Sequence, residues 1–326
     1  MADTSIEWTE QTWNPTTGCD RVSPGCDRCY ALTMAKRLKG MGSAKYQTDG
    51  DPRTSGPGFG LAMHEDVLAE PFRWKKPRRV FVNSMSDLFH AKVTDEFIAK
   101  TFAVMALTPQ HTYQILSKRH GRMRSLLGGS DFEKLVDRAL LTMPVASDPK
   151  RTGRSWPLPK PGWPLPNVHL GVSVEDQKRA DLRIPALIDT PAAVRFLSME
   201  PLIGPVDLCG PLVPGRGRPR LTYWLDGRPG FGDPVPTGTG IEMRPLTTGP
   251  RLDWVIIGGE SGPGARPMNP AWATQIVQEC QHSNVPVFVK QLGAVWAREN
   301  SASDTKGGKP ADWPEALRVR EFPELR

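Results

Sequence analysis

The stretch RVFVNSMSDLFHAKVTDEFIAKTFAVMALTPQHTYQILSK, residues 79–118, decides the fold class. Its two ends, residues 79–83 and 112–118, are short apolar runs rich in β-branched and aromatic side chains, which is typical of buried strands. Between them, residues 94–107 begin at Thr94 and continue with acidic residues, which predicts a capped helix. The stretch therefore predicts two parallel strands joined by a helical crossover.

The same alternation continues along the chain. Further predicted strands are residues 168–174, 194–199, 252–257 and 285–290, and further predicted helices are 120–141, 176–188 and 269–283. Strands that alternate with helices favour an open doubly wound sheet or a complete or partial barrel. Residues 144–166 and 209–251, rich in Pro and Gly, are interpreted as insertions, and residues 300–326 as a polar C-terminal tail.

Composition limits the classes of protein. The 326-residue chain has no apolar run long enough to span a bilayer and no signal-peptide pattern, so we expect a cytoplasmic protein without a membrane partner. Its net charge of +7 favours a polyanionic partner such as DNA or RNA. Five cysteines, an odd number, indicate metal ligands more than a disulfide framework.

Polar side chains follow each predicted strand. In parallel α/β folds the ligand site lies at the carboxyl ends of the strands, where such residues meet on one rim. An alternative is that they only cap the helices that follow. The candidates for contact with a cofactor are Ser86, Asp87, Ser173, Glu200, Gly258, Gly259, Glu260 and Lys290.

Three cysteines form the clearest chemical signal. Cys19, Cys26 and Cys29 lie in NPTTGCDRVSPGCDRCYA with the spacing C-x6-C-x2-C. Three thiolates suit a cubane iron–sulfur cluster that keeps one iron open. Structural zinc is the competing interpretation, and it needs a fourth ligand from Cys209, Cys280, His64 or His90.

The segment NPTTGC…PGCDRCYA resembles the signature of radical S-adenosylmethionine (SAM) proteins related to spore photoproduct lyase and DNA-repair photolyase-like proteins. The whole chain resembles the phage Gp37/Gp68 family (DUF5131), through VNSMSDLF at 82, QILSKR at 114, LGVSVED at 170, FLSMEPLIGPVDL at 196, VIIGGESGPGARPM at 255 and VPVFVKQLG at 285. The first cysteine gap holds six residues, against three in the usual radical SAM triplet.

The resemblance implies a partial (β/α) TIM-type barrel of about six or seven parallel strands. It also implies that Cys19, Cys26 and Cys29 hold a [4Fe–4S] cluster, that SAM binds the open iron, and that a flavodoxin or ferredoxin type of donor supplies electrons. The family does not settle the substrate; the net charge of +7, the Arg-rich residues 216–228 and the relation to lyases that act on DNA favour a nucleic-acid base, which the enzyme would modify or repair. The alternative is a zinc-binding or non-catalytic iron–sulfur module that binds nucleic acid.

Overall fold

The computed structural model describes residues 4, 6–143, 162–208, 224–227 and 249–324, together with the backbone of four short strands between 212 and 243. The predicted insertions at 144–166 and 209–251 lie largely outside these residues. The chain divides into two compact units: residues 1–173 with 190–194 and 326 form the first, and residues 174–189 with 195–325 form the second.

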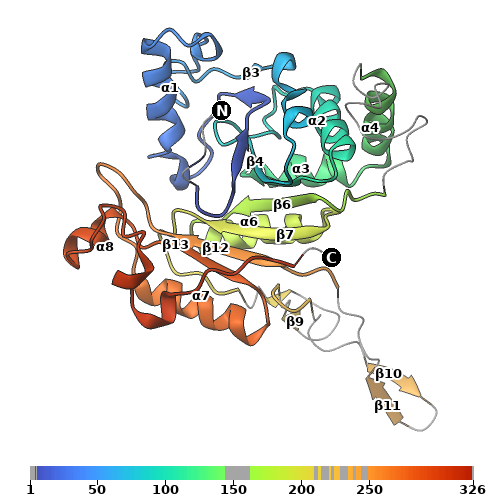
Figure 1. The fold of residues 1–326 in the computed structure, drawn as a ribbon. Helices are drawn as coiled ribbons and strands as arrows, with labels where there is room; N and C mark the ends of the chain where they lie inside the picture. Colours follow the sequence, from blue (N-terminus) through green and yellow to red (C-terminus); the bar gives the residue numbers. More distant parts are fainter. Residues whose placement is uncertain are drawn as a thin grey trace. The chain divides into compact units, whose positions relative to one another are not determined.

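One seven-stranded sheet has the order β1, β4, β5, β6, β7, β12, β13 (Figure 1). Its strands are β1 (Gln11–Trp13), β4 (Arg79–Val82), β5 (Thr112–Ser117), β6 (Val168–Ser173), β7 (Val194–Met199), β12 (Trp254–Gly258) and β13 (Val287–Gln291). They are parallel, which confirms the predicted class, an α/β fold with a partial barrel of the TIM type. All six predicted strands are present within a few residues of their expected ends.

The four predicted helices are present, and the structure adds α1 and α8, which were not predicted. The helices are α1 (Tyr30–Gly40), α2 (Asp95–Leu107), α3 (His120–Leu127), α4 (Ser130–Thr142), α6 (Gln177–Ile188), α7 (Pro270–His282) and α8 (Ala294–Glu299). α3 and α4 divide the predicted helix 120–141 at Gly128 and Gly129. Thr94 caps α2 by accepting a hydrogen bond from the Phe97 amide, as its position predicted.

Short elements complete the chain. Three antiparallel pairs are β2 (Thr16–Thr17) with β3 (Ala62–Met63), β8 (Leu212–Val213) with β9 (Arg220–Leu221), and β10 (Pro234–Thr237) with β11 (Gly240–Met243). Single 3-10 turns are η1 (Pro24–Cys26), η2 (Ala44–Tyr46), η3 (Glu65–Val67), η4 (Glu70–Arg73), η5 (Pro310–Asp312) and η6 (Glu315–Leu317). No helix in the part of the chain that the structure describes has the length and apolar character needed to cross a membrane.

In the first unit, α2 lies between the strands and α4 (Figure 1). The Phe102 ring of α2 meets the Phe132 ring of α4 edge to face, with centroids 5.3 Å apart. On the other side, the Tyr113 hydroxyl of β5 is hydrogen-bonded at 2.6 Å to the hydroxyl of Thr108, the residue that follows α2. α2 is thus buried on both sides, which explains why residues 97–107 of this helix carry few polar side chains.

The second unit has an aromatic core around Trp254 of β12. Its ring lies near the rings of Phe196, Phe288 and Phe322, with centroids 5.7 to 6.4 Å away. Residues 300–324 contribute the buried Trp313 and Leu317, and the Arg320 guanidinium stacks on the rings of Phe288 and Trp313. The segment predicted as a polar tail therefore contains side chains of the hydrophobic core.

Candidate functional site

The three cysteines lie on one loop of the first unit, after the carboxyl end of β1. Cys19 follows Gly18, Cys26 ends the turn η1, and Cys29 is the residue before α1. Gly18 has a φ of +86°, and a Cβ at this position would overlap the Gly60 carbonyl group. Only glycine tolerates both conditions, so Gly18 fixes the direction in which the chain enters the cysteine loop.

Residues that follow β4 hold this loop. The Gly18 amide donates to the Met85 carbonyl at 3.0 Å, and the Ser86 hydroxyl donates to the Gly18 carbonyl at 2.6 Å. The Tyr30 hydroxyl, at the start of α1, donates to the Ser84 carbonyl. The structure therefore brings Ser86, one of the predicted cofactor residues, next to the cysteine loop.

The thiols lie in a partly buried, charged environment. Burial is the main cause that raises the pKa of Cys19 to about 12, and the negative charge of Asp87 adds to it. Burial likewise raises the pKa of Cys29. The charge of Cys26 also raises the pKa of both Cys19 and Cys29. Without a metal, Cys19 and Cys29 are neutral thiols at neutral pH.

Two cations follow β5 and oppose this effect. Arg119 places Nη2 3.7 Å from Cys19 Sγ and 3.3 Å from the Asp20 carbonyl oxygen. Its charge lowers the pKa of Cys19, while the charge of Lys118 lowers the pKa of Cys29. Both residues thus favour the thiolate form that a metal would bind.

The Asp87 carboxylate accepts three hydrogen bonds that connect parts of the site. Its Oδ1 accepts from the Ser117 hydroxyl at 2.8 Å and from the Phe89 amide at 3.0 Å, and its Oδ2 accepts from the Lys118 amide at 2.9 Å. One carboxylate therefore ties the end of β4 to the end of β5, which sets the position of the two cations.

Asp20 and His90 form a hydrogen-bonded pair beside Cys19. His90 Nε2 lies 2.9 Å from Asp20 Oδ2, and the hydroxyls of Thr54 and Ser55 donate to Oδ1. The bond from Thr54 is the main cause that lowers the pKa of Asp20 to about 2. Since His90 Nδ1 accepts from the Lys92 amide, the hydrogen of the neutral ring is on Nε2 and points to Asp20.

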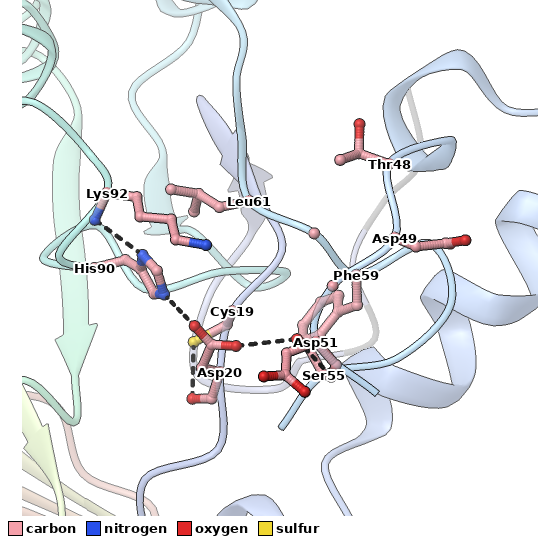
Figure 2. A pocket seen from close by; sticks show the side chains of 12 residues that line it. Cys19, Asp20, Thr48, Asp49, Asp51, Ser55, Phe59, Leu61, His90 and Lys92 are labelled. Atoms are coloured by element: carbon pink, nitrogen blue, oxygen red, sulfur yellow. Dashed lines mark hydrogen bonds and ion pairs between the residues drawn. The ribbon is translucent and has the colours of Figure 1, made fainter. Parts of the chain in front are cut away.

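These two residues line a polar cavity of about 140 Å³ in the first unit. Figure 2 shows the Asp20 carboxylate between the His90 ring and Ser55, hydrogen-bonded to both, with Cys19 beside it. Cys19 is the member of the cysteine triplet that lines it.

The remaining predicted residues meet at strand ends of the second unit, with the exception of Ser173. There Lys290 Nζ lies 2.8 Å from Glu200 Oε1, and a Cβ on Gly258 would come within 2.7 Å of the same oxygen. Glu260 makes two close bonds to the Arg266 guanidinium and one to its amide. A Cβ on Gly259 would overlap the Leu292 carbonyl, so this glycine is required by close approach of β12 to the chain after β13.

Ser173 belongs to the first unit, where its hydroxyl accepts a bond from Lys118 Nζ at 2.9 Å. The predicted cofactor residues were thus expected to lie on one rim, and the structure assigns them to two compact units. No role was expected for Asp20, and His90 was expected only as a possible zinc ligand. Arg119 was given no role either; its place in QILSKR directly after a strand is the signal that could have found it.

Among the described residues, no group of three or more His, Cys, Asp and Glu side chains is arranged to hold a single metal ion. Three thiols on one loop are the donor set that an iron–sulfur cluster uses, and the Arg119 guanidinium lies 3.7 Å from the sulfur of Cys19.

The fold and this site define an α/β protein with a parallel sheet of the partial-barrel type and a cysteine loop at the carboxyl ends of its first strands. A family model described as a protein of unknown function, DUF5131, matches residues 3–315, and the chain belongs to this family. Comparisons with the curated proteins and with the solved structures find no match.

Proposed function

We propose that the chain is an iron–sulfur enzyme of the radical SAM type, in which Cys19, Cys26 and Cys29 hold a [4Fe–4S] cluster. One observation carries the proposal: the three cysteines lie on a single loop, and Arg119, which follows the carboxyl end of β5, places Nη2 3.7 Å from the sulfur of Cys19. Ligand sites of parallel α/β folds lie at this end of the strands.

The geometry favours a cluster over one zinc ion. A zinc ion holds each thiolate at about 2.3 Å from one centre, so its ligands must converge on a point. The described residues contain no such group. A cubane binds each thiolate at a different iron and needs three protein thiolates, the number that this loop supplies.

A bound cluster would supply the electron that cleaves SAM to methionine and a 5′-deoxyadenosyl radical. This chemistry would belong to the cluster and SAM together. The protein would supply position and charge. Arg119 donates a hydrogen bond to the Cys19 sulfur, and Asp87 holds the backbone that carries Lys118. Ser86, Asp87 and Ser173 are the candidates for SAM contact in the first unit, and Glu200, Gly258, Gly259, Glu260 and Lys290 are those in the second.

The substrate that this proposal favours is a nucleic-acid base, because the net charge is +7. Its electron donor would be of the flavodoxin or ferredoxin type. The competing function is a zinc-binding or non-catalytic iron–sulfur module, which would bind nucleic acid without consuming SAM.

The test is an assay for 5′-deoxyadenosine after anaerobic reconstitution with iron and sulfide and addition of dithionite and SAM. Cys19→Ala, Cys26→Ala and Cys29→Ala should each abolish the product. Cys280→Ala is the matched control, since Cys280 is buried in α7, far along the chain from the loop, and this variant should keep the activity. A cluster-loaded wild-type protein that forms no 5′-deoxyadenosine would overturn the enzyme assignment.

A further inference from the structure

A run of cations leads into β4, whereas the residues that hold the cysteine loop follow this strand. Five of the seven residues in RWKKPRR, 73–79, are Lys or Arg, and the chain has no Asp or Glu between Glu70 and Asp87. The net charge of the whole chain is +7, so this short segment carries a large part of the excess. Like charges so close together repel one another, and an anion that binds among them relieves this repulsion.

Three side chains of the run are open to solvent. Arg73, Lys75 and Lys76 are exposed, and among the residues that the structure describes they have no ion-pair partner. Arg79 differs from them, because its Nε lies 3.6 Å from Glu10 Oε2. The run therefore offers three exposed cations to an anionic partner.

The backbone of the run is held in place. The Arg78 carbonyl accepts a hydrogen bond from the Thr112 amide at 2.9 Å, and the Trp74 amide donates to the Pro71 carbonyl at 3.2 Å. Trp74 is 5% exposed, and its ring meets the His111 ring edge to face, with centroids 5.5 Å apart. The cations thus project from an anchored segment, so a partner that binds them does not have to order this backbone first.

The side chains between the cations indicate the kind of polyanion. A segment that binds a membrane surface exposes apolar side chains that enter the lipid. Here Trp74 is buried, and the exposed large hydrophobic side chains of the described residues all lie outside 73–79. A nucleic acid requires no apolar insertion, because Lys and Arg bind its phosphates directly. The run therefore suits a phosphate backbone better than a lipid surface.

We propose that residues 73–79 form a binding surface for the phosphate backbone of a nucleic acid. Phosphate contacts supply affinity and fix the position of the partner, and they carry no sequence information. β4 has four residues and is about 13 Å long at about 3.3 Å per residue, so this surface is separate from the cysteine loop. The inference deepens the proposed function, on which its choice of a nucleic-acid partner partly rests, by naming where the backbone of that partner binds.

The test measures binding of a single-stranded oligonucleotide to the full chain by fluorescence anisotropy at several salt concentrations. The surface variant combines Arg73→Gln, Lys75→Gln and Lys76→Gln. Each phosphate contact with a single strand contributes about 0.7 to the slope of log K against log salt concentration, so the loss of three contacts should reduce the slope by about 2. This change corresponds to roughly a hundredfold weaker binding at about 50 mM salt.

The control variant combines Arg298→Gln, Lys306→Gln and Lys309→Gln. These side chains are also exposed and their replacement changes the net charge equally, but they belong to the second unit. We expect the control variant to bind as the wild type does. The proposal is overturned if both variants lose affinity equally, which would assign binding to net charge, or if the surface variant keeps the wild-type affinity. Binding of the wild type to phosphatidylserine vesicles and not to the oligonucleotide would also overturn it.

Lysine acetylation of the wild type gives a readout that needs no variant. A bound oligonucleotide should protect Lys75 and Lys76 from an amine-reactive acetylating reagent and leave Lys306 and Lys309 reactive, and equal protection of these four lysines would contradict the proposed surface. Iron and sulfide contents of the surface variant should equal those of the wild type, because the residues that hold the cysteine loop follow β4. A wild-type protein that binds the oligonucleotide at this surface but holds no cluster would refute the proposed function alone.

Discussion

At the scale of single residues, the site depends on contacts between distant parts of the sequence. Cys19 and Arg119 are one hundred residues apart and meet at 3.7 Å, and Asp20 meets His90 across seventy. The cysteine triplet was visible in the sequence because its members are close together. Asp20 and Arg119 carry no local pattern of this kind, and their roles could be recognised only when the fold brought β4 and β5 beside the loop.

Arg119 should tune the cluster. Its guanidinium donates to the Cys19 sulfur, and hydrogen bonds and positive charge near a cluster raise its reduction potential. Arg119→Gln should therefore make the midpoint potential more negative by roughly 60 mV, the equivalent of one weakened charged hydrogen bond. Spectroelectrochemistry of the reconstituted protein measures the shift. Arg119→Lys keeps the charge and should recover part of it, and equal potentials in all three proteins would refute this role.

His169 should make stability depend on pH. Its pKa falls from its usual value near 6.5 to about 4 in the fold, so the unfolded chain binds more protons between these values. The free energy of unfolding should decrease as pH falls from about 6.5 to about 4, by about 3 kcal/mol, and this contribution should not change further below that. The measurement is urea unfolding at several pH values for wild type and His169→Leu. A difference between them that is constant across this range would contradict the buried, neutral ring.

At the scale of elements, six strands and the helices between them followed from hydrophobic runs, acidic first turns and the Thr94 cap. β1 and α1 were not predicted. β1 has three residues, too few for a periodic pattern, and becomes a strand only by pairing with β4. α1 begins directly after Cys29, where the cysteine motif obscured the helical spacing. Short elements of this kind depend on tertiary partners, which a local pattern does not contain.

Gly258 and Gly259, at the end of β12, differ in what a side chain at each position would meet. Gly259→Ala would place a methyl group on the Leu292 carbonyl and should destabilise the protein by about 2 kcal/mol or more. Gly258→Ala meets the end of the Glu200 side chain, which can rotate, and should cost about 1 kcal/mol by weakening the bond to Lys290. Thermal unfolding of both variants decides the matter, and equal losses would show that the Leu292 contact is not the constraint.

At the scale of the whole molecule, the alternation of strands and helices indicated a parallel sheet or barrel and the family resemblance indicated the partial barrel. The division into two units had no signature in the sequence. Residues that were expected to share one rim belong to two units, because strand order along the chain does not show where compact units separate. The family relationship extends over residues 3–315 and includes both units.

The charge of the whole chain predicts how nucleic acid should bind. With a net charge of +7, affinity for a single-stranded oligonucleotide should fall as salt rises, with a negative slope in a plot of log K against log salt concentration. Fluorescence anisotropy at salt concentrations from about 50 to about 300 mM measures this slope, because phosphate contacts weaken over roughly this range. Affinity that is independent of salt would exclude phosphate contacts as the basis of binding.

The central claim is that Cys19, Cys26 and Cys29 hold a [4Fe–4S] cluster, and metal analysis of the anaerobically purified protein tests it most directly. We predict about four iron and four acid-labile sulfide per chain, lost when the three cysteines are replaced by alanine and retained in Cys280→Ala. One zinc per chain without sulfide, or iron that survives the triple replacement, would contradict the account.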